Sequence, residues 1–458
     1  MEALNEFLNW LNGYLWGPPM LILLFGTHLF LTFRLRFIQK YTKLGIKLSL
    51  EKEEGRTGDV SPFGALTTAL AATIGTGNIV GVATAVGLGG PGAVLWMWLT
   101  GVFGIATKYA EGLVAVKYRV KTSDGTMLGG PMYALEKGLK MKWLAVLFCI
   151  FTSVAAFGIG NMVQINAISS LMKESFSIPT FVSGFIIMVL VGAVILGGIK
   201  SIANVTIKLI PFMAIFYVLG CLIILIFNAA YIIPAIGVII KAAFTPQAAG
   251  GGFIGSTIML AARYGIARGL FSNESGLGSA PIAAAAAKAR NPVHQALVSS
   301  TGTFWDTVVV CAMTGLVLVT TIMKNPAIAV GLEGADLTHA CFSQIPVVGG
   351  IVLTVGLLTF AFSTILGWAY YGERALEYLV GKAGIKPYRV LWLIALLIGS
   401  VSKLGFVWTL ADTMNALMAI PNLVALLLLS GVIVEETRKY LWSGNLDKSE
   451  DEITETIA

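Results

Sequence analysis

The sequence predicts an all-α integral membrane protein with 11 transmembrane helices, arranged as a 5+5 inverted repeat preceded by one extra N-terminal helix. Three observations lead to this prediction. Of the 458 residues, 56% are hydrophobic and only 12% are charged, a composition far from that of soluble proteins. Eleven apolar runs are long enough to cross about 30 Å of hydrocarbon. Two of these runs are interrupted by polar residues near their centres.

The apolar runs follow one another without a long soluble insertion. They lie near residues 14–33, 62–86, 91–116, 143–172, 179–198, 205–227, 251–287, 294–323, 347–373, 388–407 and 410–434. The N-terminus lacks the basic segment of a signal peptide, so we expect the first run to remain as a span. The predicted division is therefore the extra helix in 1–36, the first five-helix repeat in 62–227, the second in 251–437 and a cytoplasmic tail in 438–458.

The basic residues predict the orientation of the chain. With the N-terminus outside, 24 of the 31 Lys and Arg residues fall in inner loops and the tail, and four fall in outer loops. Because basic loops are retained in the cytoplasm, we expect a multi-pass protein of the cell membrane with a cytoplasmic C-terminus. The lipid bilayer is then the partner that explains the composition, and no nucleic-acid partner is expected. The four cysteines lack the spacing of a disulfide framework or a metal site.

The first interruption lies in the run 62–86, where Gly75, Thr76, Gly77 and Asn78 follow one another. Each glycine weakens a helix by roughly 1 kcal/mol, and the asparagine adds polar groups that lipid cannot satisfy. A face of small residues for close helix packing explains the glycines equally well. This segment alone therefore leaves both interpretations open.

The second interruption lies in the run 251–287 and reads Ser272, Asn273, Glu274, Ser275. Four consecutive polar residues, one of them a carboxylate, are costly at the bilayer centre unless they face a cavity or a partner. A broken helix exposes amides on one half and carbonyls on the other, which is tolerated only where the backbone lines a protein-enclosed site. The sequence therefore predicts a helix broken at mid-membrane.

The spacing of the two interruptions indicates the kind of protein. If the first span is set aside, the breaks fall in core helices 1 and 6, the same position in two five-helix halves of opposite orientation. This arrangement is typical of secondary transporters, which bind substrates and ions at broken helices. A channel would need a continuous polar pore. A hydrolase built on Ser275 would need a base within reach, whereas the three histidines lie in the extra helix or at span ends, so we expect no enzyme.

Three stretches of sequence resemble one known family. They are GLFSNESGLGSAPIAAAAA from Gly269 to Ala287, IGTGNIVGVATAV from Ile74 to Val86, and WAYYGERALEY from Trp368 to Tyr378. Together they resemble the alanine or glycine:cation symporters, also called sodium:alanine symporters, and the similarity extends over most of the chain. The resemblance implies the leucine-transporter-type fold, a co-transported sodium ion, and import of alanine or glycine by alternating access. Coupling to protons instead of sodium is the alternative.

The breaks and this resemblance together suggest contacts for a zwitterionic substrate. The helix that restarts near Gly77 directs free amides at the break, which favours a carboxylate beside Thr76 and Asn78. We expect the ammonium group at the carbonyls released near residues 270–272, including Ser272, with Asn273 beside them.

Further candidate contacts lie on neighbouring spans. Gln164 either contacts the substrate or ties two helices together. Phe271, Ile365 and Trp368 could limit the size of the substrate, although such residues more often form ordinary core; the resemblance favours Phe271 and Trp368 as pocket walls.

The sodium ligands follow from the implied fold. In that fold the eighth core helix supplies a carbonyl and two hydroxyls, which match Phe360, Ser363 and Thr364, and the first core helix supplies two carbonyls, which match Ala71 and Ile74. The alternative is that the two hydroxyls only bond their own helix.

Three further charged residues lie within or near the spans. We expect Glu274 to stabilise the unwound segment, with a proton site as the alternative. An outer gate between Arg268 and Asp412 is a further possibility.

Overall fold

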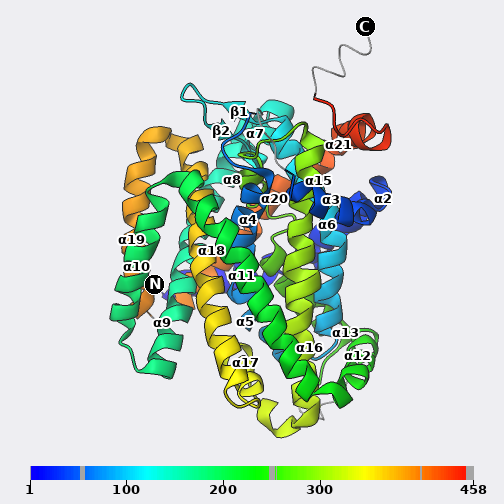
Figure 1. Cartoon of the computed structure of the whole chain (residues 1–458), viewed down its shortest axis with the longest axis vertical. Helices are drawn as coiled ribbons and strands as arrows, with labels where there is room; N and C mark the ends of the chain where they lie inside the picture. Colours follow the sequence, from blue (N-terminus) through cyan, green and yellow to red (C-terminus); the bar gives the residue numbers. More distant parts are fainter. Residues whose placement is uncertain (1, 52–56, 247–252, 254, 403–404, 450–458) are drawn as a thin grey trace.

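A computed structural model shows a helical bundle with one short hairpin (Figure 1). It describes residues 2–449 apart from 52–56, 247–252, 254 and 403–404. Three of the loop cations used to predict the orientation, Lys52, Arg56 and Lys403, lie outside the described residues, as do the first residues of the predicted second repeat and the end of the tail.

Each predicted apolar run corresponds to a helix or to a group of consecutive helices. In chain order these are α2 (Pro18–Arg34); α4 (Pro62–Thr73), η2 (Thr76–Asn78) and α5 (Val80–Gly89); α6 (Ala93–Lys117); α8 (Lys142–Ala155), η4 (Ala156–Met162) and α9 (Val163–Phe176); α10 (Thr180–Ile195); α11 (Gly198–Phe227); α13 (Ile258–Asn273) and α14 (Pro281–Ala284); α15 (Pro292–Thr303), η5 (Phe304–Cys311) and α16 (Ala312–Lys324); α18 (Val348–Val380); α19 (Ile385–Val401); α20 (Gly405–Leu428) and α21 (Ser430–Thr437). Among the described helices, eight are long and apolar enough to cross a membrane. The count of 11 spans stays a prediction.

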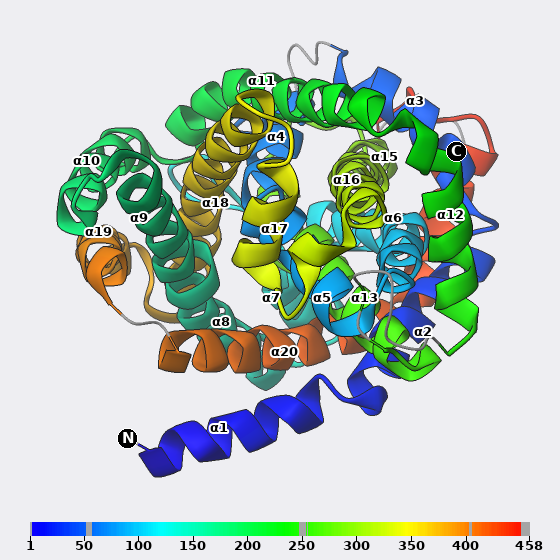
Figure 2. The same cartoon turned by 90° about the horizontal axis from the view of Figure 1, so that it is seen from below.

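Shorter elements connect these helices or cover their ends. They are α1 (Glu2–Leu15), η1 (Ile38–Tyr41), α3 (Thr42–Ser49), β1 (Val120–Lys121), β2 (Met127–Leu128), α7 (Pro131–Tyr133), η3 (Ala134–Gly138), α12 (Ala229–Phe244), η6 (Pro326–Ala329), α17 (Gly334–Phe342), η7 (Lys382–Gly384) and η8 (Arg438–Trp442). The segment 1–36, expected to hold one helix, contains two, because Pro18 starts a new helix at its first position. Figure 2 shows the first of them, α1, outside the bundle and alongside α20.

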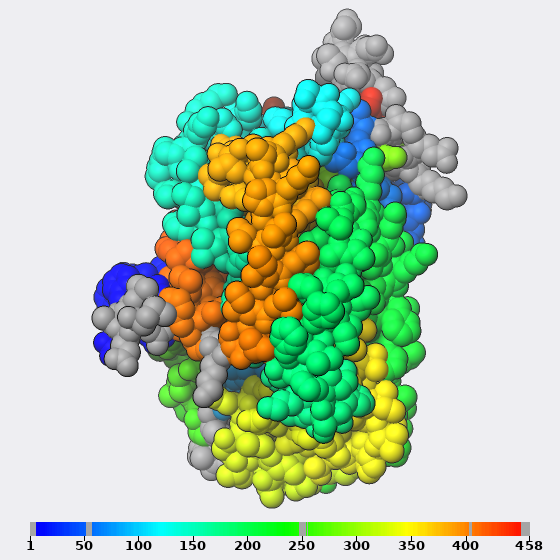
Figure 3. All heavy atoms as spheres, turned by 90° about the vertical axis from the view of Figure 1, so that its left-hand side faces the viewer, coloured from blue at the N-terminus to red at the C-terminus, as the bar shows by residue number. Residues whose placement is uncertain are grey.

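The outer surface of the bundle is apolar. Helices α10 and α19 pack side by side on the face shown in Figure 3. Their outward side chains include Phe185, Leu190, Leu391 and Ile394, which are 46–55% exposed. Large apolar patches of this kind are rare on soluble proteins, so this surface is suited to lipid contact.

The two broken helices lie inside the bundle. Helix α4 packs on α11, α15 and α18, while α13 packs on α5 and α6 (Figure 2). Both interruptions predicted from the sequence are therefore present and enclosed by protein, the condition under which irregular backbone is tolerated at membrane depth.

Candidate binding site at the two helix breaks

The first break releases two backbone carbonyls. The Gly75 amide donates to the Asn78 side-chain oxygen at 2.8 Å, and the Asn78 amide donates to the Gly75 carbonyl at 3.2 Å. In a continuous α-helix these two amides would bond the carbonyls of Ala71 and Ile74. Those carbonyls are therefore free of their usual helical partners, as the sequence analysis expected.

The second break begins where Asn273 caps the end of α13. Glu274 has a left-handed backbone with φ of 56°, and the next amide, of Ser275, donates to the Asn273 side-chain oxygen at 2.9 Å. That amide would otherwise bond the carbonyl of Phe271. The Leu270 carbonyl, by contrast, still accepts the Glu274 amide at 2.9 Å. The released carbonyls therefore begin at Phe271, one residue later than expected.

Glu111, on α6, holds the unwound segment in place. One of its carboxylate oxygens accepts the amides of Gly276 at 3.0 Å and Gly278 at 3.1 Å, and the side chain of Asn422 at 2.7 Å. The Gly276 amide is thereby diverted from the carbonyl of Ser272. Glu274 accepts the Ser279 hydroxyl at 2.6 Å, in agreement with the role expected for it, so Glu111 is a second carboxylate that stabilises the unwound chain.

Asp306, on η5, joins the two breaks to each other. Its carboxylate accepts the Asn78 side-chain amide at 2.7 Å and the Ser272 hydroxyl at 2.9 Å, and it also accepts the Thr307 hydroxyl at 2.6 Å. The residue is fully buried. The sequence analysis missed both Asp306 and Glu111, although a carboxylate inside an apolar run is a signal that could have identified each.

A small cavity lies between the breaks. Only about 10 Å³ of it can hold the centre of a water molecule, which is room for roughly one water. Its walls include five of the nine predicted substrate contacts: Thr76, Gly77, Gln164, Phe271 and Trp368. Other lining residues, including Thr73 and Glu274, were not among those nine.

The other four predicted contacts do not line this cavity. Asn78 and Ser272 are turned toward Asp306, and the Asn273 side chain donates to the Thr307 hydroxyl at 3.1 Å. Ile365 is fully buried among apolar neighbours. These four residues therefore lie outside the cavity lining, and three of them form hydrogen bonds with residues of η5.

A wide cleft of about 670 Å³ reaches the same site from one side of the bundle. Thr76, Gly77 and Phe271 line both the cleft and the small cavity. Phe271 thus stands between the two spaces, while Trp368 is only 1% exposed and packs against Gly160 at the opposite wall.

Four of the five predicted sodium ligands lie close together. The hydroxyls of Ser363 and Thr364 each lie 2.9 Å from the Phe360 carbonyl oxygen and 3.4 Å from the Ile74 carbonyl oxygen. Each hydroxyl therefore bonds a carbonyl of its own helix, as the alternative expected, and each also faces a carbonyl at the first break, as a sodium ligand would. Gly75 permits this approach, because a Cβ there would lie 2.4 Å from the Thr364 hydroxyl.

Arg268 and Asp412 face a side cavity of about 180 Å³ that is also lined by α1. No ion pair joins these two side chains within the part of the chain that the structure describes. The contact considered between Arg268 and Asp412 is therefore not formed in this structure.

The opposite side of the bundle is closed by direct pairing of the chain before α4 with the chain after α14. Val60 pairs with Ala287 in a parallel bridge, and the Lys288 amide donates to the Val60 carbonyl at 2.8 Å. The Arg119 guanidinium donates to the Ala287 carbonyl at 2.7 Å. Access to the breaks is thus open on the α5 side and sealed on the α4 side.

Comparison with known proteins places this geometry in a family. The model of the sodium:alanine symporter family matches residues 1–454. The chain belongs to the sodium:alanine symporter family. It is accordingly a membrane protein of sodium-coupled amino acid transport, and the family indicates a symporter rather than an enzyme.

Individual relatives are similar over nearly their whole length. The chain is 53% identical to the "Sodium/alanine symporter AgcS" of Methanococcus maripaludis, covering 95% of this chain and 97% of that one. It is 34% identical to the "Probable sodium/glutamine symporter GlnT" of Bacillus subtilis, covering 96% and 91%. Among solved structures, the transporter MhsT in complex with L-phenylalanine matches with a TM-score of 0.58 at 17% identity, covering 82% and 90%, which supports the leucine-transporter-type fold.

Proposed function

We propose that this protein imports alanine or glycine together with sodium by alternating access. The observation that carries the proposal is the small cavity between two broken helices, whose backbone offers amides on one side and carbonyls on the other. Among zwitterions, one with a minimal side chain needs the least widening of this space in order to bind.

The proposed substrate pose uses both breaks. The carboxylate binds at the start of α5, beside Gly77 and the Thr76 hydroxyl, where the helix dipole favours an anion. Gln164 orients that hydroxyl, since its side-chain amide lies 3.2 Å from it. The ammonium binds the carbonyls released at Phe271, and the nearby carboxylate of Glu274, which lines the same cavity, favours a cation there.

The aromatic walls account for the proposed size selection. The closed cavity admits about one water, so Phe271 on the cleft side must move away from Trp368 on the far side for any amino acid to bind, and alanine requires a smaller movement than an amino acid with a long side chain. One relative has a name that refers to glutamine, so the substrate must be tested directly. Alanine and glycine should compete with each other for uptake, whereas leucine and phenylalanine should not. Equal competition by leucine would contradict the size argument.

The proposed sodium site consists of the oxygens of Ala71, Ile74, Phe360, Ser363 and Thr364. Ligands at about 2.4 Å, as for the similarly sized calcium ion, lie about 3.4 Å apart when they are at right angles. The spacings of 2.9–3.4 Å among the four oxygens described above fit this requirement. An ion there would join α4 to α18, so sodium and substrate should each tighten the binding of the other.

The open cleft and the sealed opposite side support alternating access. With the predicted N-terminus outside, the cleft faces the exterior and the Val60–Ala287 pairing faces the cytoplasm. Counterflow distinguishes this mechanism from a channel. Vesicles loaded with unlabelled alanine should accumulate labelled alanine transiently, and a channel would show no such accumulation.

A further inference from the structure

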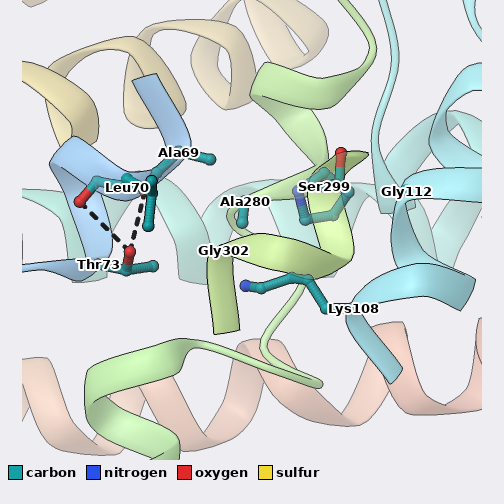
Figure 4. A pocket seen from close by; sticks show the side chains of 9 residues that line it. Ala69, Leu70, Thr73, Lys108, Gly112, Ala280, Ser299 and Gly302 are labelled. Carbon is teal, nitrogen blue, oxygen red and sulfur yellow. Dashed lines mark hydrogen bonds between the residues drawn. The ribbon is translucent and has the colours of Figure 1, made fainter. Parts of the chain in front are cut away.

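A second cavity lies on the α4 side of the breaks, next to the central cavity. Residues of the two inner half-helices, Thr73 of α4 and Ala280 before α14, line it together with Lys108 on α6 and Gly302 on α15 (Figure 4). Thr73 also lines the central cavity. The two cavities are therefore neighbours, and we call the second one the inner cavity.

The Lys108 side chain projects into the inner cavity. Figure 4 shows its nitrogen reaching from α6 toward Thr73 and Gly302. The residue is 3% exposed, and its ammonium group has no hydrogen-bond partner among the described residues. A buried cation without a partner is expensive, and such residues in membrane proteins commonly mark a transport path.

The nearby carboxylates do not saturate this ammonium. Glu111, one turn along α6, uses one oxygen to hold the unwound segment, and Glu274 accepts the Ser279 hydroxyl at 2.6 Å. Both carboxylates interact with Lys108 only through longer-range electrostatics. The Lys108 ammonium thus lies near two carboxylates and still keeps its hydrogen bonds available for an anion.

We propose that Lys108 forms a release site that binds the carboxylate of the departing amino acid. This inference rests on the proposed function. When the Val60–Ala287 pairing opens, the carboxylate moves from the α5 amides to the Lys108 ammonium, while the rest of the inner cavity is largely apolar and offers it little else. The flexible four-carbon stem of lysine allows the group to follow the substrate toward the cytoplasm.

Two variants separate the charge of Lys108 from the space around it. Lys108→Met removes the ammonium and keeps an unbranched stem. Gly302→Ala fills part of the cavity, and its Cβ would meet its nearest neighbours, Leu66 and Leu70, at an ordinary 3.7–3.8 Å, so this variant should fold. Right-side-out membrane vesicles from producing cells give one orientation, in which labelled alanine exchange is measured against internal and external alanine separately.

For Lys108→Met, the internal alanine concentration for half-maximal exchange should rise at least tenfold, whereas the external concentration should change less than twofold. Gly302→Ala should slow exchange, and the external alanine concentration for half-maximal exchange should stay unchanged. A purely structural role for Lys108 would weaken both sides together, and no change on either side would equally overturn the release site. Failure of the parent protein to exchange alanine would instead refute the proposed function.

Discussion

The sodium site offers a prediction whose size follows from the structure. In the double variant Ser363→Ala and Thr364→Val, two hydroxyl ligands are lost while the volumes of the side chains are nearly kept. Removing a dipole from a charged partner costs about 1.5–3 kcal/mol, so the pair should cost at least about 3 kcal/mol of sodium binding. At 1.4 kcal/mol per tenfold change, half-saturating sodium should rise about 100-fold.

The assay is sodium-dependent alanine uptake into proteoliposomes, measured across a wide range of sodium concentration. Alanine affinity at saturating sodium should change less, because the proposed substrate contacts lie at the breaks. Thr359→Val is a matched control, since its hydroxyl lies one turn away on α18 and bonds the Val355 carbonyl at 2.7 Å. A double variant with the sodium dependence of the parent would place the ion elsewhere and refute this site.

Three further substitutions test other parts of the site. Gly75→Ala should abolish most uptake, because its Cβ would lie 2.4 Å from the Thr364 hydroxyl; Gly81→Ala, with nothing within 4 Å, should leave uptake near that of the parent. Phe271→Ala should allow leucine to compete at least tenfold better for alanine uptake, and unchanged competition would show that this ring does not limit size. Asp306→Asn should lower thermal stability and alanine affinity together, because a buried donor that loses its hydrogen bond to the carboxylate costs about 1–3 kcal/mol. A melting temperature equal to that of the parent would contradict the role of Asp306 as the link between the breaks.

The helix breaks could be predicted because polar groups in the hydrocarbon region must be satisfied by the protein itself. Residues 272–275 are too polar to face lipid. Residues 75–78 lie at the corresponding position of the other five-helix half, which indicated that both segments are helix breaks of one inverted repeat. The exact end of α13 could not be predicted, because it depends on the Asn273 side chain capping the Ser275 amide. Local side-chain hydrogen bonds of this kind shift a helix end by a residue without leaving a clear sequence pattern.

The partners of the breaks were harder to predict than the breaks themselves. Glu111 and Asp306 are visible in the sequence as carboxylates within apolar runs, but their contacts with Gly276 and Asn78 depend on how α6 and η5 pack. The short helices α1, α12 and α17 were also missed. Each has fewer residues than a span requires, so the search for membrane-length apolar runs passed over them.

The most direct test of sodium-driven alanine import is uptake of labelled alanine into proteoliposomes under imposed ion gradients. An inward sodium gradient should drive alanine to a concentration inside the vesicles above that outside, and collapsing the sodium gradient should release the accumulated label. A proton gradient of similar size without sodium should drive no accumulation. Equal accumulation under the proton gradient alone, or equilibration without accumulation under sodium, would contradict sodium-coupled transport through this site.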